Sequence, residues 1–232
     1  MVVIKNEKAR RFLKIAVPFI FIPVILILGV FAFDEKKFAW IILAVTIMAL
    51  LLFFAGFEKK IIGTRRMVII AVMTALSVLG RFIFAVIPGF KPITAIVVIT
   101  AVWLGPESGF LTGALSAVIS NFYFGQGPWT PFQMFAWGII GLVAGYLSNI
   151  LKKNRPALAV YGVFAGIFYS MLMDVWSVLW FNNNFEMSVY LAALVTAIPY
   201  TISYAASNVV FLLLLGRPFG EKLERVKLKY GV

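Results

Sequence analysis

The chain has 232 residues, of which 62% are hydrophobic and only 13% are charged, and its mean hydropathy is +1.00. A soluble domain carries about 25% charged residues, so a chain of this composition cannot cover its apolar surface in water. The net charge of +12 lies in short clusters between apolar runs, which is the distribution of a membrane protein rather than of a nucleic-acid-binding one. The composition therefore indicates an all-α integral membrane protein embedded in the lipid bilayer, with no nucleic acid as partner.

The apolar residues form long runs of the kind that helices use to cross a bilayer, which takes about 20 residues each. We predict eight crossings, at residues 13–33, 38–57, 67–88, 92–105, 107–123, 131–151, 157–181 and 187–215. The fourth and fifth runs are short, and a Gly-Pro break separates them at Gly105.

The charged segment 57–66 divides the chain into parts. We expect an N-terminal pair of transmembrane helices in residues 1–61, a six-helix core in residues 62–216 and a basic tail in residues 217–232. The architecture predicted from the sequence is thus a six-helix core preceded by two extra transmembrane helices.

The positions of the basic residues predict the orientation. Seventeen lysines and arginines precede the first run or follow the second, sixth and eighth, and with eight crossings all of them share one side of the membrane. The opposite side holds Lys36, Lys37 and Lys91. Because positive loops stay in the cytoplasm, both termini are expected to be cytoplasmic.

The stretch Ser120–Trp137 stands out between the fifth and sixth crossings, where this topology predicts an outer connection. It combines four glycines and prolines with amide and aromatic side chains, namely Asn121, Phe122, Tyr123, Phe124, Gln126, Trp129, Gln133 and Trp137. Irregular backbone at membrane depth is tolerated where it lines a cavity, and a few polar groups among many rings are typical of a small-molecule pocket. An interfacial aromatic belt with an ordinary turn is the alternative.

Two charged residues lie inside predicted crossings, Arg81 in the third and Asp174 in the seventh. A charge inside a membrane segment is costly unless it is paired or faces a cavity, so both are candidate site residues. They would either pair with each other or line the same cavity. Arg81 could alternatively extend to the membrane interface.

Two shorter turns share the predicted outer side. The turn "IPGFKP" carries Phe90 and Lys91, and the turn "FNNNFE" carries Asn182 and Asn183. We expect these turns to cover an outward-facing site together with Ser120–Trp137. Simple solvated turns are the alternative, because asparagine is a common turn residue.

The residue types that are missing exclude several activities. The sequence has no cysteine and no histidine, which removes thiolate and imidazole metal ligands and the commonest general base. It contains no GxxxxGK[ST] phosphate loop, so the chain does not hydrolyse ATP by itself. Paired carboxylates at helical spacing, as a metal-dependent lipid enzyme would need, are also absent from the apolar runs. We therefore expect a binding subunit rather than an enzyme, with no metal and no cofactor, that depends on another protein for energy.

This pattern resembles the substrate-binding S components of energy-coupling factor (ECF) vitamin importers, over roughly residues 62–216. The similar features are six compact helices with cytoplasmic ends, the Ala-x-x-x-Ala pattern Ala71–Ala75, and the passage from Phe90 to Leu147. Within this passage, the segment "FGQGPWTPFQM" is closest to the cobalamin-type S components. Small residues also recur at four-residue spacing in later helices, as at Gly109 and Gly113, which is typical of close helix packing.

The resemblance implies a prokaryotic plasma-membrane protein that binds a vitamin at its outer face. Docking through Ala71 and Ala75 onto a transmembrane coupling (T) subunit, driven by two ABC-type ATPase subunits, is likewise implied. The ligand expected first is cobalamin or a related corrinoid such as cobinamide, as transported cargo and not as cofactor. Riboflavin or a similar vitamin is one alternative, and a scaffold or sensor that transports nothing is another. The candidate substrate-binding residues are Arg81, Phe90, Lys91, Asn121, Tyr123, Phe124, Gln126, Trp129, Gln133, Trp137, Asp174, Asn182 and Asn183.

Overall fold

The computed structural model describes residues 7–32, 38–55, 64–182 and 185–230, which form helices joined by short turns, with no strand among them. The N-terminal part consists of α1 (Glu7–Ala16), a π-helical turn η1 (Val17–Phe21), α2 (Ile22–Ala32) and α3 (Phe38–Ala55). The remainder consists of α4 (Thr64–Ile83), α5 (Ile93–Leu104), α6 (Pro106–Phe124), α7 (Trp129–Tyr146), α8 (Ser148–Leu151), α9 (Arg155–Asn182) and α10 (Met187–Tyr230). The prediction of an all-helical chain is confirmed.

Each of the eight predicted runs coincides with a helix or helical segment, but their lengths differ from the prediction. Within the described residues, four segments are long and apolar enough to cross a membrane, namely Glu7–Leu28, Arg65–Ile83, Arg155–Asn182 and Met187–Lys229. Helix α5 has 12 residues and is about 18 Å long, which is shorter than a bilayer core of about 30 Å. The structure thus supports several membrane-spanning helices without confirming a count of eight.

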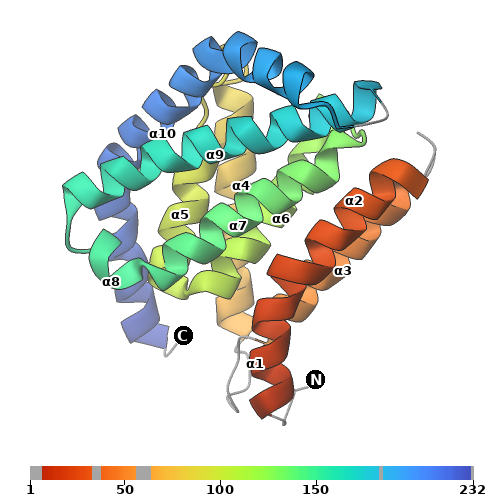
Figure 1. The fold of residues 1–232 in the computed structure, drawn as a ribbon. Helices are drawn as coiled ribbons and strands as arrows, with labels where there is room; N and C mark the ends of the chain where they lie inside the picture. Colours follow the sequence, from red (N-terminus) through yellow and green to blue (C-terminus); the bar gives the residue numbers. More distant parts are fainter. Residues whose placement is uncertain (1–6, 33–37, 56–63, 183–184, 231–232) are drawn as a thin grey trace.

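Helix α5 lies at the centre of the molecule (Figure 1), in contact with α4, α6, α7 and α10. All of its residues except Trp103 are buried. Helix α9 runs alongside α7 and passes in front of α4 and α5, and the long α10 curves around the other side (Figure 1). Because protein rather than lipid surrounds α5, its short length leaves no polar backbone exposed to lipid.

Glycines bring α6 and α7 into close contact. A Cβ atom at Gly113 would lie 2.5 Å from the carbonyl carbon and oxygen of Trp137, and one at Gly109 would lie 3.0 Å from the backbone oxygen of Gly141. Small residues at four-residue spacing thus serve internal packing here, as such ridges do between membrane helices. This contact fixes the position of Trp137 in the middle of α7.

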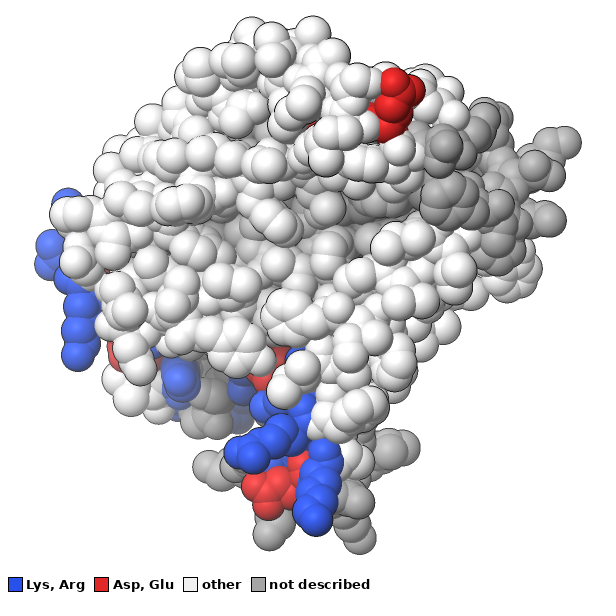
Figure 2. Space-filling model, in the orientation of Figure 1, with Lys and Arg blue, Asp and Glu red and all other residues white. Residues whose placement is uncertain are grey.

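The basic end of the molecule is built around the C-terminus of α5 and the N-terminus of α6. Arg66 of α4 donates hydrogen bonds to the backbone oxygen of Leu104 and, at 3.1 Å, to the hydroxyl of Ser108. The N-terminus of α1 and the C-terminus of α10 lie at this end (Figure 1), and the lysines and arginines visible in Figure 2 gather there. The described basic residues that Figure 2 shows are therefore gathered at one end of the molecule, as expected from the sequence.

The N-terminal helices lean against one side of the core. Helix α3 packs on α6 and α7, with Val45, Ala49 and Leu52 fully buried. An ion pair of 2.9 Å also joins Lys14 of α1 to Glu107 in the first turn of α6. The outer face of α4 is left open, and both Ala71 and Ala75 are exposed on it.

The irregular stretch predicted at Ser120–Trp137 is shorter than expected. Helix α6 continues to Phe124 and α7 begins at Trp129, so the connection is only Gly125–Pro128. Gly125 ends α6 with a positive φ of 99°, which glycine adopts at little cost. Pro131 falls in the first turn of α7, where a missing backbone N–H has no helical acceptor to lose. Gly125 therefore ends one helix and Pro131 lies inside the start of the next, so neither lengthens the turn.

The α6–α7 contact yields a stability prediction. Gly113→Ala should lower the free energy of unfolding by about 1–3 kcal/mol, because the added methyl group meets backbone that cannot move aside. Thermal unfolding of the purified protein in detergent measures this. Gly216→Ala is the matched control, since its Cβ would approach only a Leu158 methyl carbon, at 3.3 Å. Equal melting temperatures for the two variants would contradict this account of the contact.

Candidate functional site

A cavity of about 210 Å³ lies beside the α4–α5 connection, at the far end of α4 from Arg66 and the basic end. It is lined by Arg81, Gly89, Lys91, Ile93, Thr94, Gln133, Trp137, Tyr169, Tyr204 and Asn208. We call it the Arg81 cavity. Its lining comes from α4, α5, α7, α9 and α10 and from the turn between α4 and α5, so it depends on the fold of the whole core.

Arg81 is the buried charge of this cavity, with 8% of its surface exposed. Its Nη1 donates hydrogen bonds to the hydroxyl of Ser120 and, at 2.7 Å, to Oδ1 of Asn121. Its guanidinium carbon also lies 4.5 Å from the ring centre of Phe124 and 5.6 Å from that of Trp137. Neutral acceptors and ring faces therefore fix the orientation of this cation without neutralising it.

The amide groups of the α6–α7 region form one hydrogen-bonded chain. Fully buried Asn121 donates through Nδ2 to Thr130 and to Oε1 of Gln133, both at 2.8 Å. The Nε2 of Gln133 then donates to the hydroxyl of Tyr169 at 3.2 Å. One end of this chain bonds to Arg81 and the other to Tyr169, and both of these residues line the cavity. Asn121 therefore holds lining residues in position from behind the cavity.

Aromatic rings form one wall of the cavity. Trp137 and Tyr169 are stacked, with ring centres 5.1 Å apart and planes 13° apart, and Tyr204 meets Tyr169 edge to face. These rings come from α7, α9 and α10. Flat apolar walls with a few fixed polar groups are the composition of a small-molecule pocket.

The α4–α5 turn is attached to α10 by backbone contacts. The backbone N–H of Lys91 donates to the hydroxyl of Ser207 at 2.7 Å, and that hydroxyl donates back to the Lys91 carbonyl at 2.9 Å. Gly89 adopts a φ of 74°, and a Cβ there would lie 2.9 Å from Ser203, so the close approach requires glycine. Burial lowers the pKa of the Lys91 ammonium from its ordinary value, and the charge of Arg81 lowers that pKa further.

Of the predicted site residues, the structure places Arg81, Lys91, Gln133 and Trp137 in the lining. Asn121 and Phe124 lie behind them, in contact with Arg81. The others lie elsewhere. Two of them pack against other rings: Phe90 lies on Phe84 and Phe211, and Trp129 lies on Trp176. Gln126 is hydrogen-bonded to Thr130 and to the Val118 carbonyl. Tyr123 is 75% exposed, and Asn182 is exposed at the end of α9. Asn183 lies outside the described residues.

Asp174 does not line the Arg81 cavity, and no ion pair within 4 Å joins its carboxylate to Arg81. Its Oδ2 atom is buried and has no hydrogen-bond partner among the described residues. The two charges predicted inside the membrane thus form no ion pair with each other, and of the two only Arg81 lines this cavity.

Sequence reasoning missed most of the lining from the last two helices. Tyr169, Tyr204 and Asn208 lie in the middle of long apolar runs, where aromatic and amide residues are ordinary packing residues. Asn208 donates to the backbone oxygen of Gly162 at 3.1 Å and so joins α10 to α9. The sequence signal that could have found Asn208 is its polar side chain deep in an apolar run, which is costly in a membrane unless it is paired or lines a cavity.

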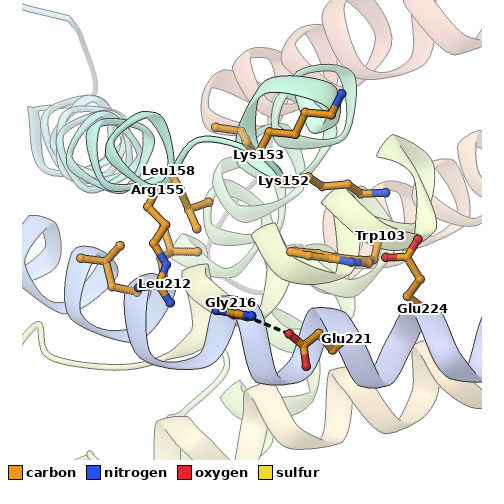
Figure 3. Close-up of a pocket in the computed structure, with 12 residues that line it drawn as sticks. Trp103, Lys152, Lys153, Arg155, Leu158, Leu212, Gly216, Glu221 and Glu224 are labelled. Atoms are coloured by element: carbon orange, nitrogen blue, oxygen red, sulfur yellow. Dashed lines mark hydrogen bonds and ion pairs between the residues drawn. The ribbon is translucent and has the colours of Figure 1, made fainter.

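A second hollow, of about 420 Å³, lies at the basic end between α5, the α8–α9 connection and α10 (Figure 3). Lys152 lies near the ring of Trp103, and Arg217 is ion-paired with Glu221 at 2.9 Å. Glu224 also lines this hollow, so charges of both signs surround it. With one aromatic residue and long charged side chains, it lacks the ring-lined walls of the Arg81 cavity.

Comparison with known proteins reveals the family. The model of the family described as "ECF-type riboflavin transporter, S component" matches residues 61–225. A UPF0397 protein of Aliivibrio fischeri is 27% identical over 169 residues, covering 67% of this chain and 87% of the relative. A UPF0397 protein of Clostridium perfringens is 24% identical over 183 residues, covering 75% and 96%. No solved structure matches the chain significantly.

The hydrogen-bonded chain behind the cavity predicts a stability effect. Asn121→Ala should lower the free energy of unfolding by about 1–3 kcal/mol, because it removes one buried hydrogen bond from each of Arg81, Thr130 and Gln133. Asn182→Ala, at the exposed end of α9, should change it by less than about 0.5 kcal/mol. Thermal unfolding in detergent compares the two. If Asn121→Ala melts like the wild type, the chain does not hold the site together.

Proposed function

The chain belongs to the family of S components of ECF-type riboflavin transporters, and we propose that it is the substrate-binding subunit of an ATP-driven vitamin importer. Separate subunits would supply the energy, namely a transmembrane coupling protein and two ABC-type ATPases. The absence of a phosphate-binding loop from the sequence supports this division of labour. The observation that carries the proposal is a ring-lined cavity at the end of the core opposite the basic end.

The proposed orientation follows from charge. Lysines and arginines gather at one end (Figure 2), and positive residues at a membrane surface mark the cytoplasmic side. The Arg81 cavity then faces the exterior of a prokaryotic cell, and both chain termini are cytoplasmic. A binding subunit of an importer needs this arrangement, because its ligand arrives from outside.

The exposed face of α4 is the proposed docking surface for the coupling subunit. Ala71 and Ala75 are both exposed there, one helical turn apart, and small side chains let a partner helix approach closely. The N-terminal helices make their main contacts with α6 and α7, so they leave this face accessible. The two extra helices are therefore compatible with the assembly that the family implies.

For the transported vitamin, the cavity supports a single planar ring system, such as the one that riboflavin carries, rather than a corrinoid macrocycle. A volume of about 210 Å³ is below the roughly 300–1,000 Å³ of pockets that enclose drug-sized ligands. The stacked Trp137 and Tyr169 present ring faces on which a planar ligand can lie. A corrinoid, with its four-ring macrocycle, would require the α4–α5 turn to open. Cobalamin and cobinamide thus become the second candidates, favoured by the "FGQGPWTPFQM" segment.

Equilibrium binding tests the vitamin proposal. Purified protein should bind one of riboflavin, cobalamin or cobinamide with a Kd of about 1 μM or tighter. Trp137→Ala should weaken that binding about tenfold or more, because it removes a ring from the cavity wall. Trp129→Ala is the matched control, since Trp129 lies outside the lining. Failure of every vitamin to bind, or equal losses in both variants, would count against the site.

Assembly tests the docking surface independently. Ala71→Trp or Ala75→Trp should weaken capture of the coupling subunit about tenfold or more, because added bulk prevents close helix approach. Vitamin binding by the isolated protein should be unchanged. Val160→Trp, which adds similar bulk to an exposed position on α9, should leave assembly intact. Normal capture by the Ala71 and Ala75 variants would exclude this surface.

A further inference from the structure

The Arg81 cavity is positively charged. Of the ten side chains and glycine positions that line it, Arg81 and Lys91 carry charge, and neither aspartate nor glutamate is among them. The remaining polar groups are hydroxyls and amides, which are neutral. A buried cavity with two cations and no carboxylate is unusual, because a buried charge is normally paired.

The hydrogen bonds of Arg81 leave part of its guanidinium available. Both bonds to Ser120 and Asn121 use Nη1. Nε is buried without a hydrogen-bond partner, and Nη2 makes none with any residue that the structure describes. An arginine presents its donors in a planar fork that matches carboxylate and phosphate oxygens. Arg81 is thus held through Nη1, and because Nε is buried out of reach, Nη2 is the donor left for a ligand in the cavity.

Lys91 adds a second cation to the same space. Its backbone is fixed to Ser207, and its ammonium lies 5.8 Å from the ring centre of Phe124, the ring on which Arg81 also lies. Two like charges around one ring repel each other. An anion between them would relieve this repulsion and supply the acceptors that both groups lack.

The only acidic residue well inside α9 does not supply this anion. Asp174 forms no ion pair with Arg81 and stays outside the lining. The phenols of Tyr169 and Tyr204 face the cavity, but they are neutral donors and acceptors at physiological pH. An anionic group of a bound molecule would supply the charge that the lining lacks.

We propose that the Arg81 cavity binds a carboxylate or phosphate group of its ligand between the Arg81 guanidinium and the Lys91 ammonium, so that an anionic vitamin binds more tightly than a neutral one with the same ring system. This inference rests on the proposed function for the identity of the ligand as a vitamin. It goes beyond that function because it selects charged over neutral molecules with the same ring system.

Matched ligand pairs test the proposal. Riboflavin 5′-phosphate against riboflavin, and biotin against biotinamide, differ in the anionic group while sharing a ring system. The anionic member of the bound pair should bind roughly tenfold to a hundredfold more tightly, as charge-assisted hydrogen bonds in a desolvated site do. Preference within the first pair identifies a phosphate, and preference within the second identifies a carboxylate. Equal or tighter binding of the neutral members would overturn the proposal.

Variants identify the groups responsible. Lys91→Met should remove most of the preference for the anion, and Arg81→Met should remove the rest, whereas Arg81→Lys should retain part of it. Lys152→Met is the control, because Lys152 lies 5.7 Å from the ring centre of Trp103 at the basic end. Should Arg81→Met fail to fold, Lys91→Met alone decides. An anion preference that survives in Lys91→Met would overturn the proposed pair.

Inorganic phosphate and acetate separate this inference from the proposed function. If no vitamin binds but either anion raises the melting temperature of the wild type and not of Lys91→Met, the anion site stands and the vitamin function fails. If a neutral vitamin binds tightly and neither anion has any effect, the vitamin function stands and the anion site fails.

Discussion

The buried charge of Arg81 is the constraint on which the functional end of this protein depends. A guanidinium inside a helical membrane core costs several kcal/mol unless polar groups surround it. Here the α6 residues Ser120 and Asn121 accept from it, and the ring of Phe124 covers it. Hydrogen bonds continue from Asn121 to Gln133 and from Gln133 to Tyr169. Four helices, α4, α6, α7 and α9, are thereby joined around one cation.

The same arrangement explains the unusual composition of the α6–α7 region. Its amides are used within the protein: Asn121 holds lining residues in place from behind the cavity, and Gln133 lines the cavity while bonded to Asn121 and Tyr169. Close helix contact at Gly113 places Trp137 against this polar chain, and docking of the α4–α5 turn on α10 closes the cavity from the other side. Close helix packing thus brings the buried polar groups within hydrogen-bonding distance, and their hydrogen bonds in turn hold the helices together. The N-terminal helices attach away from this region, on α6 and α7.

Much of this architecture can be predicted from sequence, because apolar length and glycine–proline breaks are strong local signals. They place the helices in the right order, and the charge of Arg81 inside an apolar run points to the residue that lines the candidate cavity. The predicted irregular stretch Ser120–Trp137 is too long, because its amide and aromatic residues are as compatible with helix ends as with a loop. The contributions of Tyr169 and Tyr204 could not be predicted either. Their positions depend on how α9 and α10 pack across the core, and an aromatic residue in an apolar run carries no sign of that.

Site-directed labelling tests most directly whether the cationic cavity opens to the cell exterior. The chain has no cysteine, so Val86→Cys would introduce a single thiol on the α4–α5 turn, at a position that is 87% exposed. A membrane-impermeant maleimide should label it in intact cells, while Lys153→Cys at the basic end should react only after permeabilisation. The opposite pattern would place the Arg81 cavity on the cytoplasmic side and contradict a role in capturing a vitamin from outside.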